Sequence, residues 1–104
     1  MTAFVDNTNL LRVKGLFNVL DATFVNAGTV TAIIKDSTGA QVAGQTWPVT
    51  MNYQAASNGD YVAAIEDDVA FVNGSTYVAE ITALDGASKG FWEFPFVPVT
   101  RTRK

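Results

Sequence analysis

Apolar and polar residues alternate along most of this chain, in runs of five to ten residues separated by turn-forming residues. β-branched and aromatic residues dominate the runs, and the turn residues recur at spacings near ten. Short strands at such spacings are typical of antiparallel sandwiches and barrels. No stretch of useful length has the 3.6-residue period of a helix. The pattern therefore predicts an all-β chain.

The clearest strand is predicted over Thr29 to Lys35, where Val30, Ala32 and Ile34 share one side. Asp36-Ser37-Thr38-Gly39 follows it directly. An aspartate can bond the backbone that comes after it, and a glycine accepts the positive φ of a bulged turn. The sequence therefore predicts a hairpin at this point.

The return strand of this hairpin is predicted over Gln41 to Val49, with Trp47 covering one end of the core. Because Pro48 has no N–H to donate to a ladder, this strand should lie at an edge or bulge there. The first apolar run, Leu10 to Leu20, is predicted to form two strand pieces that bend near Gly15.

Three further strands are predicted in the second half of the chain, each alternating with period two: Tyr61 to Glu66, Ser75 to Ala83 and Lys89 to Val99. In the last of them, Trp92, Phe94 and Phe96 are expected to face the core. Phe91 and Pro95 then point outward. Together with Val97 they could form an apolar outer face of the kind that marks protein contacts, unless loops cover that side too.

Composition supports one packed domain over residues 1–104, with a short N-terminal arm (1–9) and a basic C-terminal tail (100–104). Hydrophobic residues make up 48% of the chain and charged residues 16%, which favours a core over disorder. The apolar runs are too short for a membrane-spanning helix, so no membrane insertion is expected. Residues 1–9 lack the basic and apolar regions of a secretory signal, which predicts synthesis in the cytoplasm.

The net charge of −3 is unevenly distributed, because Arg101, Arg103 and Lys104 supply three of the seven basic residues. The rest of the chain is more acidic and should repel nucleic-acid phosphates, so no nucleic-acid partner is expected. The three basic residues could contact an acidic partner. The alternative is an ordinary solvated terminus.

Few residues point to catalysis, since the chain contains no cysteine and no histidine. Glu66, Asp67 and Asp68 are expected near Asp60, where they could gather around a cation, although a solvated acidic loop is favoured. A glycosidase would need two acids flanking a cleft, which a domain this small has little room for. We therefore expect a protein that is not an enzyme, with no catalytic residue, metal or cofactor.

Gly74-Ser75-Thr76-Tyr77, followed by an alternating strand, resembles the tyrosine corner of fibronectin-III and immunoglobulin-like domains, in which the tyrosine hydroxyl is tied to the preceding loop. Over Val30 to Phe96 a longer series of motifs appears in order: Asp36-Ser37-Thr38-Gly39, Trp47-Pro48, Gly59-Asp60-Tyr61, Gly74-Ser75-Thr76-Tyr77 and Trp92-Glu93. This series resembles small immunoglobulin-like domains encoded among the structural proteins of tailed phages and prophages.

The resemblance implies an immunoglobulin-like antiparallel β-sandwich of about seven strands that serves as a virion component of the tail, baseplate or capsid surface. Its partners would be other virion proteins or copies of itself, and its arms would lie against neighbouring subunits. A carbohydrate- or cell-surface-binding module is the alternative. It would stack an exposed Trp47 or Tyr53 on a host-surface glycan.

Overall fold

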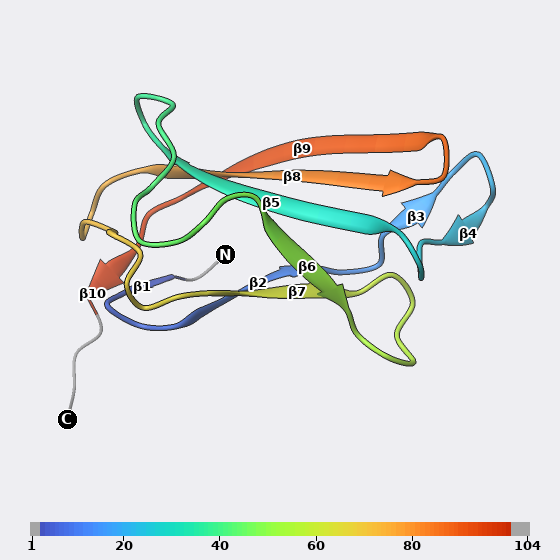
Figure 1. Cartoon of the computed structure of the whole chain (residues 1–104), viewed down its shortest axis with the longest axis horizontal. Helices are drawn as coiled ribbons and strands as arrows, with labels where there is room; N and C mark the ends of the chain where they lie inside the picture. The colour runs from blue at the N-terminus through green and yellow to red at the C-terminus, as the bar shows by residue number, and fades with distance from the viewer. Residues whose placement is uncertain (1–2, 101–104) are drawn as a thin grey trace.

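The computed structural model describes residues 3–100, and every regular element in them is a strand, as predicted (Figure 1). Six strands form one antiparallel sheet in the order β2-β7-β6-β5-β8-β9. Their bounds are β2 (Asn9–Val13), β5 (Thr29–Asp36), β6 (Val49–Tyr53), β7 (Tyr61–Ile65), β8 (Tyr77–Asp85) and β9 (Ser88–Phe96). The other four have two residues each: β1 (Phe4–Val5), β3 (Phe17–Asn18), β4 (Thr23–Phe24) and β10 (Val99–Thr100).

The six-stranded sheet curls at β6, because the two halves of that short strand pair with different neighbours. Val49 to Met51 pair with β5, whereas Asn52 and Tyr53 pair with β7. In Figure 1, β5, β8 and β9 lie along one side, β2 and β7 lie along the other, and β6 crosses between them. The curl lets a single sheet enclose its own core.

The core lies inside this curl and is built from residues at every second position of the main strands. The inward side is almost fully buried in β2, β5, β7 and β8, as in Val30, Ala32 and Ile34 of β5, which are at most 1% exposed. Further core side chains come from β2, β7 and β8: Leu11, Val13, Tyr61, Ala63, Ile65, Tyr77, Ala79 and Ile81. The alternation predicted for β5, β7 and β8 is confirmed.

The hairpin turn after β5 is also confirmed. Oδ1 of Asp36 accepts hydrogen bonds from the Thr38 hydroxyl at 2.6 Å, the Thr38 N–H at 2.9 Å and the Ala40 N–H at 3.1 Å. The bonds from Thr38 stabilise the carboxylate and hold the pKa of Asp36 below its usual value. Gly39 has a φ of 89°, as the turn requires.

The predicted return strand over Gln41 to Val49 is wrong in most of its length. Gln41 makes a single bridge to Lys35, and the strand proper begins after Pro48. Between them the chain folds onto a different loop: Trp47 Nε1 donates to Val42 O at 2.7 Å, and Ala70 N donates to Ala43 O at 3.0 Å. The carbonyl oxygens of Val42 and Ala43 are therefore not available to β5.

The last predicted strand, Lys89 to Val99, is interrupted rather than continuous. β9 ends at Phe96, and the chain passes through Val97 and the buried Pro98 before β10. Proline donates no ladder bond, which accounts for the break. β10 then pairs in parallel with β1 (Figure 1).

The predicted N-terminal arm, residues 1–9, is largely part of the fold. It contains β1 and the first residue of β2, and Ala3 is 2% exposed. Val99 N donates to Ala3 O at 3.1 Å, so the arm is tied to the C-terminal segment of its own chain. Of the predicted tail, Thr100 belongs to β10, whereas Arg101, Arg103 and Lys104 lie outside the described residues.

Two buried tyrosines fasten the connections between strands. The Tyr77 hydroxyl accepts a hydrogen bond from Val72 N at 2.8 Å, which is the bond expected of a tyrosine corner. The Tyr61 hydroxyl accepts from Gly28 N at 3.1 Å and donates to Val25 O at 2.8 Å. The first bond holds the crossing loop between β7 and β8, and the other two hold the segment that leads into β5.

Candidate functional site

The outward side of β9 carries four exposed side chains, Lys89, Phe91, Glu93 and Pro95, which we call the outer face. β9 is an edge strand, because β8 is the one neighbour it has in the sheet formed by residues 3–100. The Phe91 side chain is 58% exposed. The alternative that loops cover both sides of this strand does not hold for the described part of the chain.

Val97 lies just past the end of β9 and is 48% exposed. On the neighbouring strand, Leu84 of β8 is paired with Lys89 and is 43% exposed. Phe91 and Pro95 are thus exposed on the same side of β9, and Val97 is exposed beyond its end. Arg101, Arg103 and Lys104 cannot be placed relative to them.

Within the described part of the chain, the charged residues of the outer face lack partners of opposite charge. Glu93 is paired with Glu80 of β8, so two acidic residues are direct cross-strand neighbours. Glu80 forms a salt bridge with Lys35 of β5, with 3.1 Å between Nζ and Oε1. Among residues 3–100, neither Glu93 nor Lys89 forms a salt bridge of its own. The edge therefore presents one uncompensated negative and one uncompensated positive charge.

A second apolar surface lies at the β3–β4 ribbon, which the sequence analysis did not single out. The turn of this ribbon exposes Val19 and Leu20 by 80% and 83%, and Phe17 and Phe24 stack edge to face with their ring centroids 5.3 Å apart. Val19 and Leu20 are adjacent apolar residues in the turn, whereas Phe17 and Phe24 lie on β3 and β4. That arrangement is the signal by which the sequence could have revealed them.

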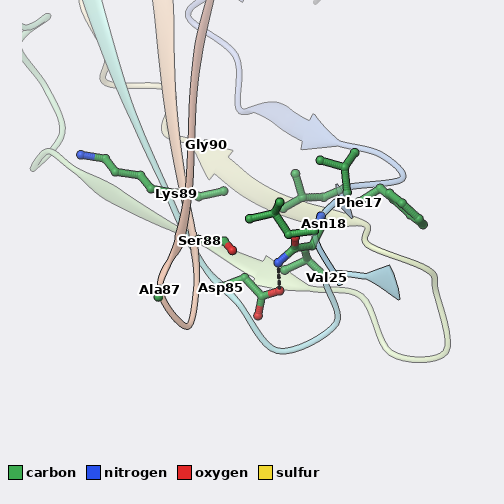
Figure 2. A pocket seen from close by; sticks show the side chains of 12 residues that line it. Phe17, Asn18, Val25, Asp85, Ala87, Ser88, Lys89 and Gly90 are labelled. Atoms are coloured by element: carbon green, nitrogen blue, oxygen red, sulfur yellow. Dashed lines mark hydrogen bonds between the residues drawn. The ribbon is translucent and has the colours of Figure 1, made fainter. Parts of the chain in front are cut away.

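A cavity of about 350 Å³ separates this ribbon from the β8–β9 hairpin (Figure 2). Its walls come from two distant parts of the sequence, residues 16–25 and residues 83–90. The lining is mainly apolar: Leu16, Phe17, Val19, Leu20, Val25, Ala83, Ala87 and Gly90, with Asn18, Asp85, Ser88 and Lys89 as its polar members.

Asn18 holds the ribbon in place against the hairpin. Its Nδ2 donates to Oδ2 of Asp85 at 3.0 Å, the contact drawn in Figure 2, and to Oδ2 of Asp21 at 3.2 Å. Its Oδ1 accepts from the backbone N–H of Leu20 at 3.0 Å. A buried side chain with this many partners fixes the cavity's outline.

The cavity wall suits apolar contact better than acid–base chemistry. Asp85 is the one carboxylate among the described residues that line it, and Asn18 already bonds that group. Glycoside hydrolysis needs a second carboxyl group across the site. The geometry thus favours a surface that receives an apolar side chain.

The acidic residues do not gather as the sequence suggested. The whole of β7 separates Asp60 from Glu66, Asp67 and Asp68, a distance of about 20 Å along an extended strand. Asp60 instead accepts a hydrogen bond from Gly15 N at 2.9 Å. Within residues 3–100, no group of three acidic side chains is placed to hold a metal ion.

The aromatic residues considered for sugar stacking are partly buried. Trp47 packs against the core, and its indole N–H is bonded to Val42 O. The Tyr53 hydroxyl donates to Ser57 O, and its ring lies 5.6 Å from the ring of Tyr61. Neither side chain combines a free ring face with a free polar group, so these positions count against a sugar-stacking role.

One structural finding and three comparisons with known proteins complete the description of the site. Residues 3–100 contain no helix that could cross a membrane. Comparison of the chain with protein-family models, with curated proteins and with solved structures finds no match.

Proposed function

We propose that this chain is a non-catalytic structural protein that assembles through protein contacts at the outer face of β9. The observation that carries the proposal is the exposed apolar surface along that edge, where Phe91 is 58% and Val97 48% exposed. Aromatic side chains exposed on a rigid strand are typical anchors of protein interfaces.

The particle to which it belongs is, in this proposal, a bacteriophage virion, with the protein in the tail, baseplate or capsid surface. The ordered series of motifs between Val30 and Phe96 supports this assignment. The fold would be an immunoglobulin-like sandwich, which the bond from Val72 N to the Tyr77 hydroxyl supports. Its partners would be other virion proteins or copies of itself.

Mass spectrometry of density-purified particles from the producing cell tests this proposal. We expect the chain to co-purify in many copies, at a stoichiometry comparable with that of known structural proteins. Its absence from the particles would overturn the virion role. A glycan-binding screen of the free protein would then test the binding-module alternative.

A further inference from the structure

We propose that two copies of this chain associate by antiparallel pairing of their β9 strands, about a twofold axis at Phe91. The inference rests on the proposed function, because it names the partner that the outer face of β9 receives. A second copy is the occupant that matches both the free backbone groups and the charges at this edge.

The β8–β9 hairpin determines which backbone groups of β9 are free. Its loop has two residues, Gly86 and Ala87, between the paired residues Asp85 and Ser88. In such a hairpin the pair next to the loop exchanges both hydrogen bonds, and bonded pairs alternate from there. The even-numbered residues of β9 therefore bond β8, and the odd-numbered ones direct N–H and C=O toward the open edge.

Pro95 agrees with this assignment, because it is an odd-numbered residue with no N–H to leave unpaired. Proline in a sheet is normally found with its nitrogen facing away from a ladder. The donors that remain on the edge are those of Lys89, Phe91 and Glu93. Three residues flanked by a turn and a proline form a short pairing segment.

The charges favour one register for that segment. With Phe91 opposite Phe91 of the second copy, Lys89 lies opposite Glu93 and Glu93 opposite Lys89. Neither residue has an ion pair within residues 3–100, and Glu93 already lies beside the acidic Glu80. A lysine from the second copy would compensate the repulsion between these two glutamates. Opposite charges that face each other across a ladder are stabilising.

The alternative symmetric registers fit less well, since an axis at Gly90 or Trp92 leaves Lys89 and Glu93 without a partner of opposite charge. An axis at Lys89 places two lysines opposite each other, and an axis at Glu93 places two glutamates opposite each other. Like charges in this position are destabilising. The axis at Glu93 would also bring Pro95 into the ladder, where it cannot donate.

The core-facing side of β9 gives further support for the register centred on Phe91. In the register centred on Phe91, Trp92 of the second copy lies opposite Gly90. The backbone of Gly90 does not require glycine, since a Cβ there would meet nothing nearer than the Trp92 ring at 3.6 Å. Glycine inside a strand often marks a position where another backbone approaches closely, and Gly90 also lines the cavity.

Sedimentation velocity over a concentration series tests the pairing through a charge exchange. We expect the unmodified chain to form dimers, and Lys89→Glu and Glu93→Lys each to raise the dissociation constant about tenfold or more. An equimolar mixture of the two variants should dimerise again, because each chain then supplies the charge that the other lacks. Lys14→Glu, an exposed change outside β9, is the matched control and should dimerise normally.

A second variant tests the backbone pairing. Phe91→Pro removes the N–H at the twofold axis without removing a bond to β8, so it should be monomeric. Circular dichroism identifies any variant that fails to fold, and the charge variants then decide the question. An unmodified chain that stays monomeric up to its solubility limit would overturn the pairing, as would single charge variants that dimerise normally.

The particle experiment keeps this inference distinguishable from the proposed function. A chain that is monomeric in solution but present in many copies in particles would overturn the β9 pairing and support the structural role. A chain that dimerises with the predicted charge dependence but is absent from particles would support the β9 pairing and overturn the structural role.

Discussion

Single residues set the geometry of the turns in this chain, and two of them can be tested in isolation. Asp36 organises the hairpin after β5 by accepting three hydrogen bonds from the residues that follow it. Gly59 permits the close approach of two segments far apart in the sequence. In both cases hydrogen bonding or close backbone contact, rather than the burial of an apolar side chain, determines the path of the chain.

The pKa of the Asp36 carboxyl should lie below its usual value, because the Thr38 side chain and backbone bond the ionised form. Such a group contributes stability above its unfolded pKa, and this contribution is lost as the pH falls through the lower folded pKa. Thr38→Val should raise the pKa toward its usual value in an NMR titration. Ser37→Ala should leave it unchanged, and equal pKa values in both variants would contradict the assignment.

Gly59→Ala should destabilise the protein more than Gly39→Ala does. Both glycines have positive φ, so alanine costs about 1–2 kcal/mol of backbone strain at either position. At Gly59 a Cβ would also lie 2.4 Å from the Leu16 oxygen, whereas nothing lies within 4 Å at Gly39. Urea unfolding of the two variants checks the difference, and equal losses of stability would show that the close approach does not matter.

At the scale of elements, hydrogen bonds from buried tyrosines hold the connections to the strands. Tyr61 lies on β7 and bonds the segment that leads into β5, and Tyr77 begins β8 and bonds the loop that precedes it. The first tyrosine has two backbone partners and the second has one. Their hydroxyl groups should therefore differ in their contribution to stability.

Tyr61→Phe should lower the free energy of unfolding by about 2–3 kcal/mol, because it leaves both Gly28 N–H and Val25 C=O without a partner. Tyr77→Phe should cost about 1 kcal/mol, since only Val72 N–H loses its partner. Chemical denaturation measures both values. A larger loss for Tyr77→Phe would contradict this ranking.

The sequence was a good guide where structure depends on local pattern. The period-two burial of β5, β7 and β8, the Asp36 turn and the Tyr77 bond follow from neighbouring residues, and all are present. The outward direction of Phe91 could be predicted for the same reason, whereas the position of β9 at the edge of the sheet could not.

Features that depend on distant contacts could not be predicted in this way. The alternation of residues 41–48 is typical of a strand, but Ala43 O accepts a hydrogen bond from Ala70 N and Val42 O accepts one from the Trp47 indole. The parallel pairing of β1 with β10 joins the two ends of the chain, which no local signal indicates. The cavity likewise needs the β3–β4 ribbon and the β8–β9 hairpin to meet, through the bond between Asn18 and Asp85.

At the scale of the whole molecule, a curled sheet encloses the core and leaves β9 as an exposed edge with an apolar outer face. Both ends of the described chain are fastened to the fold by β1 and β10. The N-terminal segment is therefore occupied within its own chain, and we expect assembly contacts at β9 instead. Variants of the outer face should consequently impair assembly and leave folding intact.

The most direct test of this account compares the unmodified chain with Phe91→Ser for incorporation into particles, measured by quantitative mass spectrometry. Thr50→Ser, an exposed change on β6, is the control. We predict many copies of the unmodified and control chains in purified particles and a large loss of Phe91→Ser, although the variant folds normally. Equal incorporation of Phe91→Ser, or particles that lack the unmodified chain, would contradict assembly through the outer face of β9.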